Sequence, residues 1–274
     1  PSLRDARERL LVPSAPSVPC RARTWGRFVQ SNEVRRMHDL SAIPPQFPAC
    51  VGGRQGIPLH ASALADAIPL SDVFPLFEMD FGVAFPASSN VTVQRPVAIT
   101  AQGRVDGMLM HWSLEVWPGM EVYSTDPELR KWQDHWHQVV WPFAEVTSEV
   151  ALGQQVQLQA AHNDTEIWAR LQVSDQSSPT PPLELSPQPC TCGLHPLLPV
   201  QRVLALNDAS WVTSLQRALQ TSIGQAEGGT VLDLCDGSFA GLLAAGLTQG
   251  RVVALEPKAA HRAATSRMVR ANNL

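Results

Sequence analysis

The sequence predicts an antiparallel β-barrel or β-sandwich followed by the beginning of a doubly wound, Rossmann-like α/β domain. Residues 23–173 hold short apolar or alternating runs that Gly, Pro and Asn turns interrupt, a texture typical of antiparallel sheets. Residues 174–205 are rich in Pro and Ser, which favours a linker over a packed element. From residue 206 the pattern changes to strand, glycine turn, helix, strand and acid, the opening of a doubly wound domain.

The first 22 residues form an entry segment. The polar run SLRDARERLL suits a short helix, and the three prolines of VPSAPSVPC that follow forbid one. Within residues 23–173, the runs VTVQRPVAIT and VDGMLMHWSLEVW are the clearest strand candidates. The predicted order is therefore a short helix, an extended crossing and then the sheet domain.

Residues 206–274 follow a helical period and then alternate between strands and helices. Asn207 or Asp208 is a suitable N-cap for a helix that ends near residue 221. Short strands are expected at Thr230–Leu234 and Val252–Glu256, with a helix over Leu242–Leu247. Two strands cannot form a stable parallel sheet, so we expect this to be only the start of an α/β domain.

Composition limits the classes of function. A net charge of −4 without a long basic run argues against nucleic acid as a direct partner, and the lack of an apolar run of about 18 residues argues against a membrane span. Five scattered cysteines favour a reducing compartment, the cytoplasm or nucleus. Because the chain begins with proline and stops just after a helix, we expect it to be a fragment of a longer protein.

The stretch WQDHWHQVVWPF, Trp132–Phe143, concentrates tryptophan and histidine. Alternating Trp, His and Val residues are typical of a half-buried strand. His135 and His137 lie two residues apart and could share one strand face as metal ligands, although no acid with clear spacing accompanies them. The third alternative is one wall of an active site. Spacing alone leaves these three interpretations open.

A second motif lies in the predicted linker. Cys190, Cys192 and His195 form C-x-C-x-x-H around a glycine, and two thiolates with an imidazole can bind zinc. Asp164 and His162, in the polar turn AHND, are the candidate fourth ligands. The alternative is a chance pairing of cysteines in a proline-rich segment. If the motif binds zinc, we expect a structural site that fixes the linker.

The third motif, VLDLCDGSFAG, resembles the cofactor loop of S-adenosylmethionine-dependent methyltransferases, with Glu256 placed to hold ribose hydroxyls. Glycines let the backbone approach the cofactor. Here Cys235 and Phe239 stand where the family has glycine, and only Gly237 remains. We therefore favour a structural remnant over a working site that would use Asp233 and Glu256, and a generic α/β turn would use the same residues.

Several segments together resemble the protein arginine methyltransferases. Asp134-His135-Trp136-His137-Gln138 resembles the family's Thr-His-Trp loop, with Asp in place of Thr. ERLLVPSAPSVPCRA resembles the passage from the family's methyltransferase domain into its barrel, and LSDVFPLFEMDF resembles a barrel segment. A barrel followed by the start of another methyltransferase domain requires two modules in tandem. This order, the C-x-C-x-x-H linker and the glycine-poor second loop resemble the tandem members that form monomethylarginine.

The resemblance implies an active site of which this chain supplies one wall. S-adenosylmethionine and two substrate-binding glutamates would belong to a first module that lies outside these residues. His135 would support the loop of that module that bears the glutamates, Trp136 would line the guanidinium pocket, and Asp134 completes the motif. The fragment alone is expected to be inactive. The second module would act as a partner within the chain, so that a monomer imitates a dimer, with zinc at Cys190, Cys192, His195 and Asp164.

The implied substrates are arginine-containing proteins such as histones and Arg-Gly-rich proteins. The alternative function is a non-catalytic interaction protein, a β-barrel module tethered to a degenerate nucleotide-binding fold. The remaining conspicuous polar residues are expected to lie on solvated or edge positions and not to catalyse: Glu78, Asp80, His111 and Glu115.

Overall fold

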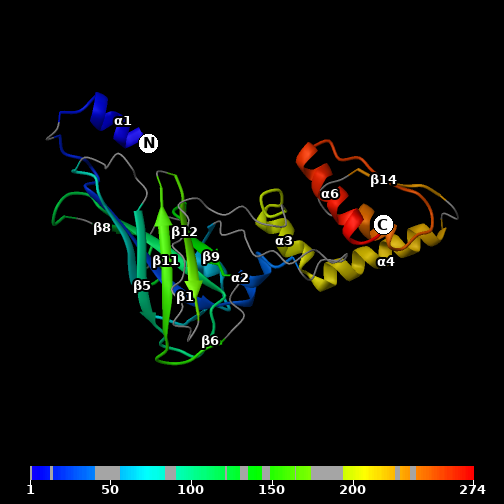
Figure 1. Ribbon diagram of the computed structural model, residues 1–274, viewed down its shortest axis with the longest axis horizontal. Helices are drawn as coiled ribbons and strands as arrows, with labels where there is room; N and C mark the ends of the chain where they lie inside the picture. Colours follow the sequence, from blue (N-terminus) through cyan, green and yellow to red (C-terminus); the bar gives the residue numbers. More distant parts are fainter. Residues whose placement is uncertain are drawn as a thin grey trace. The chain divides into compact units, whose positions relative to one another are not determined.

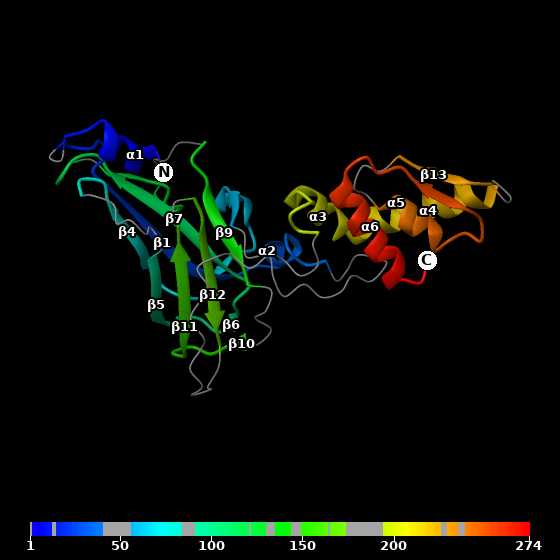
Figure 2. The ribbon, with the colours of Figure 1, turned by 45° about the horizontal axis from the view of Figure 1, so that its top comes forward.

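Figure 1 and Figure 2 show a computed structural model of the chain. The structure describes residues 2–12, 15–40, 56–83, 91–120, 122–129, 135–143, 149–163, 165–173, 194–225, 229–234 and 239–274. The chain divides into two compact units. The sheet unit comprises Pro1–Arg35 and Arg54–Gln188, and the helical unit comprises Arg36–Gly53 and Pro189–Leu274.

The sheet unit consists mostly of short strands in antiparallel pairs, as the alternating sequence predicts. Two short helices and one 3-10 turn accompany them: α1 (Ser2–Arg9), α2 (Asn32–Arg36) and η1 (Ala61–Ala63). The strands are β1 (Arg21–Gln30), β2 (Ile57–Leu59), β3 (Ile68–Pro69), β4 (Phe74–Asp80), β5 (Val91–Ala98), β6 (Gly103–Arg104), β7 (Gly107–Glu115), β8 (Val122–Ser124), β9 (Gln138–Pro142), β10 (Glu149–Val150), β11 (Gln155–His162) and β12 (Ile167–Gln172).

The longest strands organise two sheets. In the larger sheet the order is β2-β9-β7-β1-β3, with β4 also pairing with β1 and β8 with β7. The second sheet has the order β12-β11-β5, and Figure 1 shows these three strands side by side. Strand β1 pairs with β7 along nearly its whole length, with Trp25 opposite His111. The prediction of an antiparallel sheet domain is confirmed.

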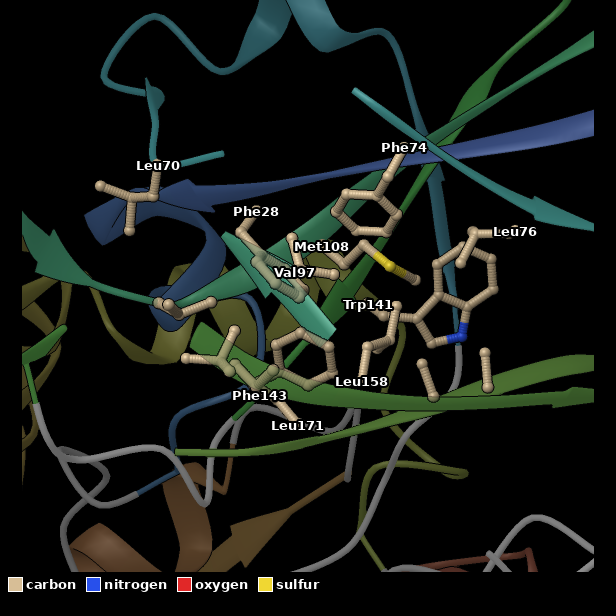
Figure 3. Packing of buried hydrophobic residues seen from close by; sticks show 14 of the residues in the cluster. Phe28, Leu70, Phe74, Leu76, Val97, Met108, Trp141, Phe143, Leu158 and Leu171 are labelled. Carbon is tan, nitrogen blue, oxygen red and sulfur yellow. The ribbon is translucent and has the colours of Figure 1, made fainter. Parts of the chain in front are cut away.

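The core of the sheet unit lies between the inner faces of these sheets. Alternate residues of β1 are buried, and Phe28 is fully covered, with its ring centroid 5.1 Å from that of Phe74 and 6.2 Å from that of Phe143. Figure 3 shows the three rings packed together with Trp141. Burial of one such side chain stabilises a fold by about 1.5–3 kcal/mol. At Gly26 a Cβ would lie 2.7 Å from Phe74, so close packing requires glycine there.

The helical unit contains the predicted α/β elements, which are labelled in Figure 2 except for β14, labelled in Figure 1. Strands β13 and β14 pair in parallel, and the prediction of a Rossmann-like opening is confirmed. Asp208 caps α4, since its Oδ1 accepts hydrogen bonds from the amides of Ser210 and Trp211. The elements are α3 (Val200–Leu206), α4 (Ala209–Gln225), β13 (Val231–Asp233), α5 (Ala240–Ala245), β14 (Val252–Ala254) and α6 (Ala259–Ala271).

The structure differs from the predicted domain boundaries in two places. Helix α3 falls largely within the predicted linker, and Leu194 and Leu198 before it are buried in the helical unit. Val203 and Leu206 are three residues apart and lie on the buried face of α3. The linker prediction missed this helical spacing because it used the Pro-rich composition of the whole segment. In addition, residues 36–40 leave the predicted sheet domain, and Leu40 packs in the core of the helical unit. The other predicted boundaries stay predictions.

Across the helices that the structure describes, none has the length and apolar character required to cross a bilayer.

Candidate functional site

The His-Trp motif lies just before β9, in the sheet unit. Asp134 is outside the described residues. His135 and His137 are exposed, Trp136 is half-buried, and Gln138, the first residue of β9, is fully buried. Part of the indole of Trp136 is therefore accessible to a ligand, while the strand that follows it is fixed in the sheet.

Trp136 is surrounded by other aromatic rings. Its centroid lies 5.0 Å from Trp112 on β7 and 5.8 Å from Tyr123 on β8, the latter in an edge-on arrangement. The ring of His135 is 6.0 Å away. Aromatic faces attract cations, guanidinium included, within about 6 Å of the ring centroid. The cluster Trp112, Tyr123 and Trp136, which we call the aromatic cluster, can therefore present a face to a cationic side chain.

The alternative that His135 and His137 bind a metal receives no support from the geometry. The ring of His137 contacts that of His60 at 4.6 Å, whereas His135 contacts Trp136. In the parts of the chain that the structure describes, no three His, Cys, Asp or Glu side chains gather as metal ligands.

Of the predicted zinc ligands, Cys190, Cys192 and Asp164 lie outside the described residues. The alternative fourth ligand His162 ends β11, where its ring meets that of Phe77 edge-on at 4.6 Å. The remaining ligand, His195, lies just before α3. Its ring stacks on that of His38, with centroids 4.0 Å apart and planes 5° from parallel. Its Nε2 lies 2.7 Å from the carbonyl oxygen of His38, so Nε2–H is the donor of this hydrogen bond. Zinc-binding histidines commonly donate their other N–H to a carbonyl in this way. The donor set of two thiolates and this imidazole fits zinc.

His38 was not singled out by the sequence. It is 157 residues from His195 along the chain, it is 6% exposed, and no motif surrounds it. Because its ring lies face to face with that of His195, with the planes 5° from parallel, a metal in the plane of one ring lies out of the plane of the other. His38 therefore stacks on the predicted ligand His195 and does not share a metal with it in this arrangement.

At the turn that the sequence predicts to be a cofactor-loop remnant, both acids accept hydrogen bonds from nearby backbone amides. Asp233 accepts a hydrogen bond from the amide of Gly241 at 2.9 Å. Glu256 accepts one from the amide of Lys258 at 3.0 Å, and its other oxygen is 3.5 Å from Nδ1 of His261. The Glu256 side chain is only 9% exposed. Each carboxylate therefore accepts a hydrogen bond from a backbone amide at the start of a helix: Asp233, at the end of β13, from α5, and Glu256, just after β14, from the residue before α6.

A cavity of about 300 Å³ adjoins these acids. Most of its lining is apolar, and Phe239 forms part of the wall. Phe239 has a left-handed backbone (φ 58°), a conformation that glycine adopts without strain and that costs other residues about 1–2 kcal/mol. Cys235 and Gly237 lie outside the described residues, so the cradle of the cofactor loop itself stays a prediction.

The acids of the sheet unit form a ladder of ion pairs on the outer face of β1. Arg21 binds Glu115 at 3.0 Å and lies 3.3 Å from Glu78, while Arg23 binds Glu78 at 2.7 Å. Asp80 is 3.9 Å from Arg21. Glu78 and Asp80 are solvated as expected, whereas Glu115, 14% exposed on the interior strand β7, is not.

His111 is 6% exposed on β7, an interior strand of the larger sheet, so the expectation that it lies at a solvated or edge position was wrong. Its ring stacks on Trp25 at 6.3 Å, and its Nε2 is 3.9 Å from a carboxylate oxygen of Asp126. Burial lowers the pKa of His111 below its ordinary value of 6.5, with Arg27 acting in the same direction and Asp126 and Glu128 opposing it. The neutral ring is therefore favoured at neutral pH.

Comparison with known proteins finds relatives along the whole chain. A Rattus norvegicus protein is 26% identical and a Bos taurus protein 28% identical, each matching 100% of this chain and 42% of the relative. An Arabidopsis thaliana protein is 27% identical over 94% of this chain and 38% of its own length. No protein-family model matches the chain.

A solved structure, the Trypanosoma brucei PRMT1 enzyme-prozyme heterotetrameric complex with AdoHcy, matches 58% of this chain and 51% of its own with a TM-score of 0.41 and 16% identity.

These relatives are protein arginine N-methyltransferases by name, which agrees with the resemblance seen in the sequence. The rat and cattle relatives are both named protein arginine N-methyltransferase 7, and the Arabidopsis relative is named protein arginine N-methyltransferase 1.6. The chain spans about two fifths of the length of these relatives.

Proposed function

We propose that the chain is part of an enzyme that transfers a methyl group from S-adenosylmethionine to protein arginine side chains, giving mainly monomethylarginine. The observation that supports this best is the half-buried indole of Trp136, which stands in a motif like the family's Thr-His-Trp loop and packs on Trp112 and Tyr123. Histones and Arg-Gly-rich proteins are the proposed substrates, and the cytoplasm and nucleus the proposed location.

In the proposed mechanism this chain binds and orients the guanidinium. The face of Trp136 restricts where the planar group lies, and cation–π attraction favours it there by about 0.5–2 kcal/mol. His135, exposed beside the indole, supports the loop that bears the substrate-binding carboxylates, which a preceding module supplies. S-adenosylmethionine, bound by that module, supplies the electrophilic methyl group. Correct placement of the nucleophilic nitrogen is the main contribution of this chain to the rate.

A structural zinc ion is part of the proposal. Cys190, Cys192 and His195 would hold it, with Asp164 as the fourth ligand. Its role is structural, fixing the segment before α3, because none of the proposed chemistry needs a metal. The helical unit would act as an internal partner for the preceding module, so that a monomer replaces the dimer.

Mass spectrometry of the native protein tests the zinc site. We expect one zinc per chain, lost in Cys192→Ser. Loss of zinc in Asp164→Asn but not in His162→Gln would assign the fourth ligand to Asp164, and the reverse result would assign it to His162. A native protein without metal contradicts the site.

Methylation of an Arg-Gly-rich peptide by the full-length protein tests the catalytic proposal. Trp136→Ala is expected to lower kcat/KM by about 100-fold, since small misplacements near reacting groups cost that much. Trp117→Ala is the control, because Trp117 is 42% exposed on the β7–β8 connection and should leave kcat/KM nearly unchanged. The present chain alone is expected to show no turnover. If the full-length protein methylates nothing, the non-catalytic interaction module becomes the better description.

A further inference from the structure

Gln138 is a fully buried polar side chain that follows Trp136 by two residues. Its Nε2 donates a hydrogen bond to the carbonyl oxygen of Thr125 at 2.6 Å, and its Oε1 accepts one from the amide of Ala61 at 2.9 Å. Buried amides are retained where both ends find partners. Gln138 therefore joins three segments: the start of β9, the residues after β8, and η1.

Thr125, which accepts the hydrogen bond from Gln138, also binds the backbone of Trp112 in the aromatic cluster. It is also fully buried. Its hydroxyl oxygen accepts a hydrogen bond from the amide of Trp112 at 3.0 Å and donates to the carbonyl of Trp112 at 3.2 Å, while its own amide donates to that carbonyl at 2.9 Å. The backbone of Trp112 is thus held on both sides by one residue.

These contacts connect Gln138 to both members of the indole pair, Trp136 and Trp112. From Gln138 one path runs along the backbone to Trp136. The other runs through Thr125 to Trp112, whose ring meets the Trp136 ring at 5.0 Å. Buried hydrogen bonds are stronger than exposed ones and are costly to break. Gln138 therefore anchors the backbone two residues after Trp136 to the segment that holds the backbone of Trp112, which favours contact between the two indoles.

We propose that Gln138 is the positioning residue of Trp136: it fixes the indole against Trp112 and so sets the wall on which the substrate guanidinium lies. Its use in catalysis rests on the proposed function, whereas its effect on the ring pair does not. Gln138 does not touch substrate in this proposal; it acts through Trp136.

The first test is spectroscopic and independent of activity. Two indoles in contact give an exciton couplet in circular dichroism, and Trp136→Phe identifies the part that comes from this pair. Gln138→Glu keeps the size of the side chain but removes the donor to Thr125. The full chain with this substitution is expected to lose the couplet as Trp136→Phe does. A couplet that survives in folded Gln138→Glu overturns the proposal.

A second pair of variants protects the test against simple misfolding. Thr125→Val removes the hydroxyl at nearly constant shape and should weaken the couplet, whereas Thr125→Ser retains the hydroxyl and should preserve it. Gln159→Glu is the matched control, because Gln159 on β11 is a buried glutamine (3% exposed) in the second sheet of the same unit. If Gln159→Glu or Thr125→Ser removes the couplet as fully as Gln138→Glu does, the role is general stability and the proposal is wrong.

Kinetics of the full-length protein then test the catalytic consequence. Gln138→Glu should lower kcat/KM for an arginine peptide by about 10- to 100-fold and leave the KM for S-adenosylmethionine unchanged, since the displaced group is a substrate wall. Loss of the couplet with unaltered peptide kinetics would separate Gln138 from catalysis and refute its positioning role there. If the unsubstituted protein has no activity, the proposed function fails, and the couplet still decides whether Gln138 places Trp136.

Discussion

The sheet unit and the helical unit each contain a family-like motif, and their motif residues are held in opposite ways. In the sheet unit, Gln138 and Thr125 make the buried hydrogen bonds, and the aromatic ring of Trp136 stays partly accessible. In the helical unit, Asp233 and Glu256 themselves make the hydrogen bonds, to amides at the starts of α5 and α6.

The difference shows how a binding motif can be told from a remnant. A side chain that recognises a ligand must keep its recognition surface available, so other residues have to supply the scaffold. Where the motif's own acids hold the local backbone, a ligand would have to compete with those contacts. The sheet unit therefore has the better candidate site, although both motifs match family patterns in part.

The largest effect is expected from Phe28→Ala, which removes a fully covered ring from the scaffold of the sheet unit. A cavity of this kind should lower the free energy of unfolding by about 3–5 kcal/mol. Denaturant unfolding followed by circular dichroism measures it. Val122→Ala, at a position 55% exposed, should change it by less than about 0.5 kcal/mol. Equal effects would mean that the core does not stabilise the sheet unit.

Asp106→Ala should rank next. Asp106 is a buried carboxylate that accepts hydrogen bonds from the amide of Ser31 at 2.9 Å and from Arg104 at 3.0 Å. Its removal leaves a buried amide and a cation without their acceptor, at a cost of about 3 kcal/mol. Thermal unfolding provides the measurement, and a loss below about 1 kcal/mol would show that water replaces the carboxylate freely.

Glu256→Ala bears on the remnant interpretation of the helical unit. Removal of the acceptor for the Lys258 amide should destabilise the unit by about 1 kcal/mol, as loss of a helix cap does. Calorimetry with S-adenosylmethionine should show no binding at this turn before or after the change. Measurable binding that Glu256→Ala abolishes would make the turn a working site and remove the contrast between the units.

The smallest effect concerns pH and His111. Because burial lowers the pKa of His111 below 6.5, the unfolded chain binds this proton more readily than the folded one. Stability should therefore be complete above pH 6.5 and decline as the pH falls toward the lowered pKa. His111→Gln should flatten this decline in denaturant midpoints measured across that range. A decline that is the same in both proteins would assign it to other groups.

Local patterns in the sequence were sufficient for most of the regular structure. The runs VTVQRPVAIT and VDGMLMHWSLEVW contain β5 and β7, and Asp208 marked the start of α4 because capping depends only on neighbouring residues. Helix α3 was missed because composition was averaged over a Pro-rich segment.

The candidate site could be predicted only in part. Trp136 was found through its motif, but nothing near Gln138 or Thr125 in the sequence indicates that their side chains meet. The same holds for His38 and His195, which are 157 residues apart. Contacts between residues so far apart in the sequence depend on how the strands and helices pack. The spacing of apolar residues within one strand or helix carries no information about that packing.

The return of residues 36–40 to the helical unit has a practical consequence for dissection of the chain. Leu40 is 4% exposed and shares a core with Leu194 and Leu198, so the polypeptide passes between the units more than once. Truncation after residue 173 would strip Leu40 and His38 of these neighbours and leave an apolar stub on the excised sheet unit. A soluble excised sheet unit would require Leu40 to be replaced by a polar residue.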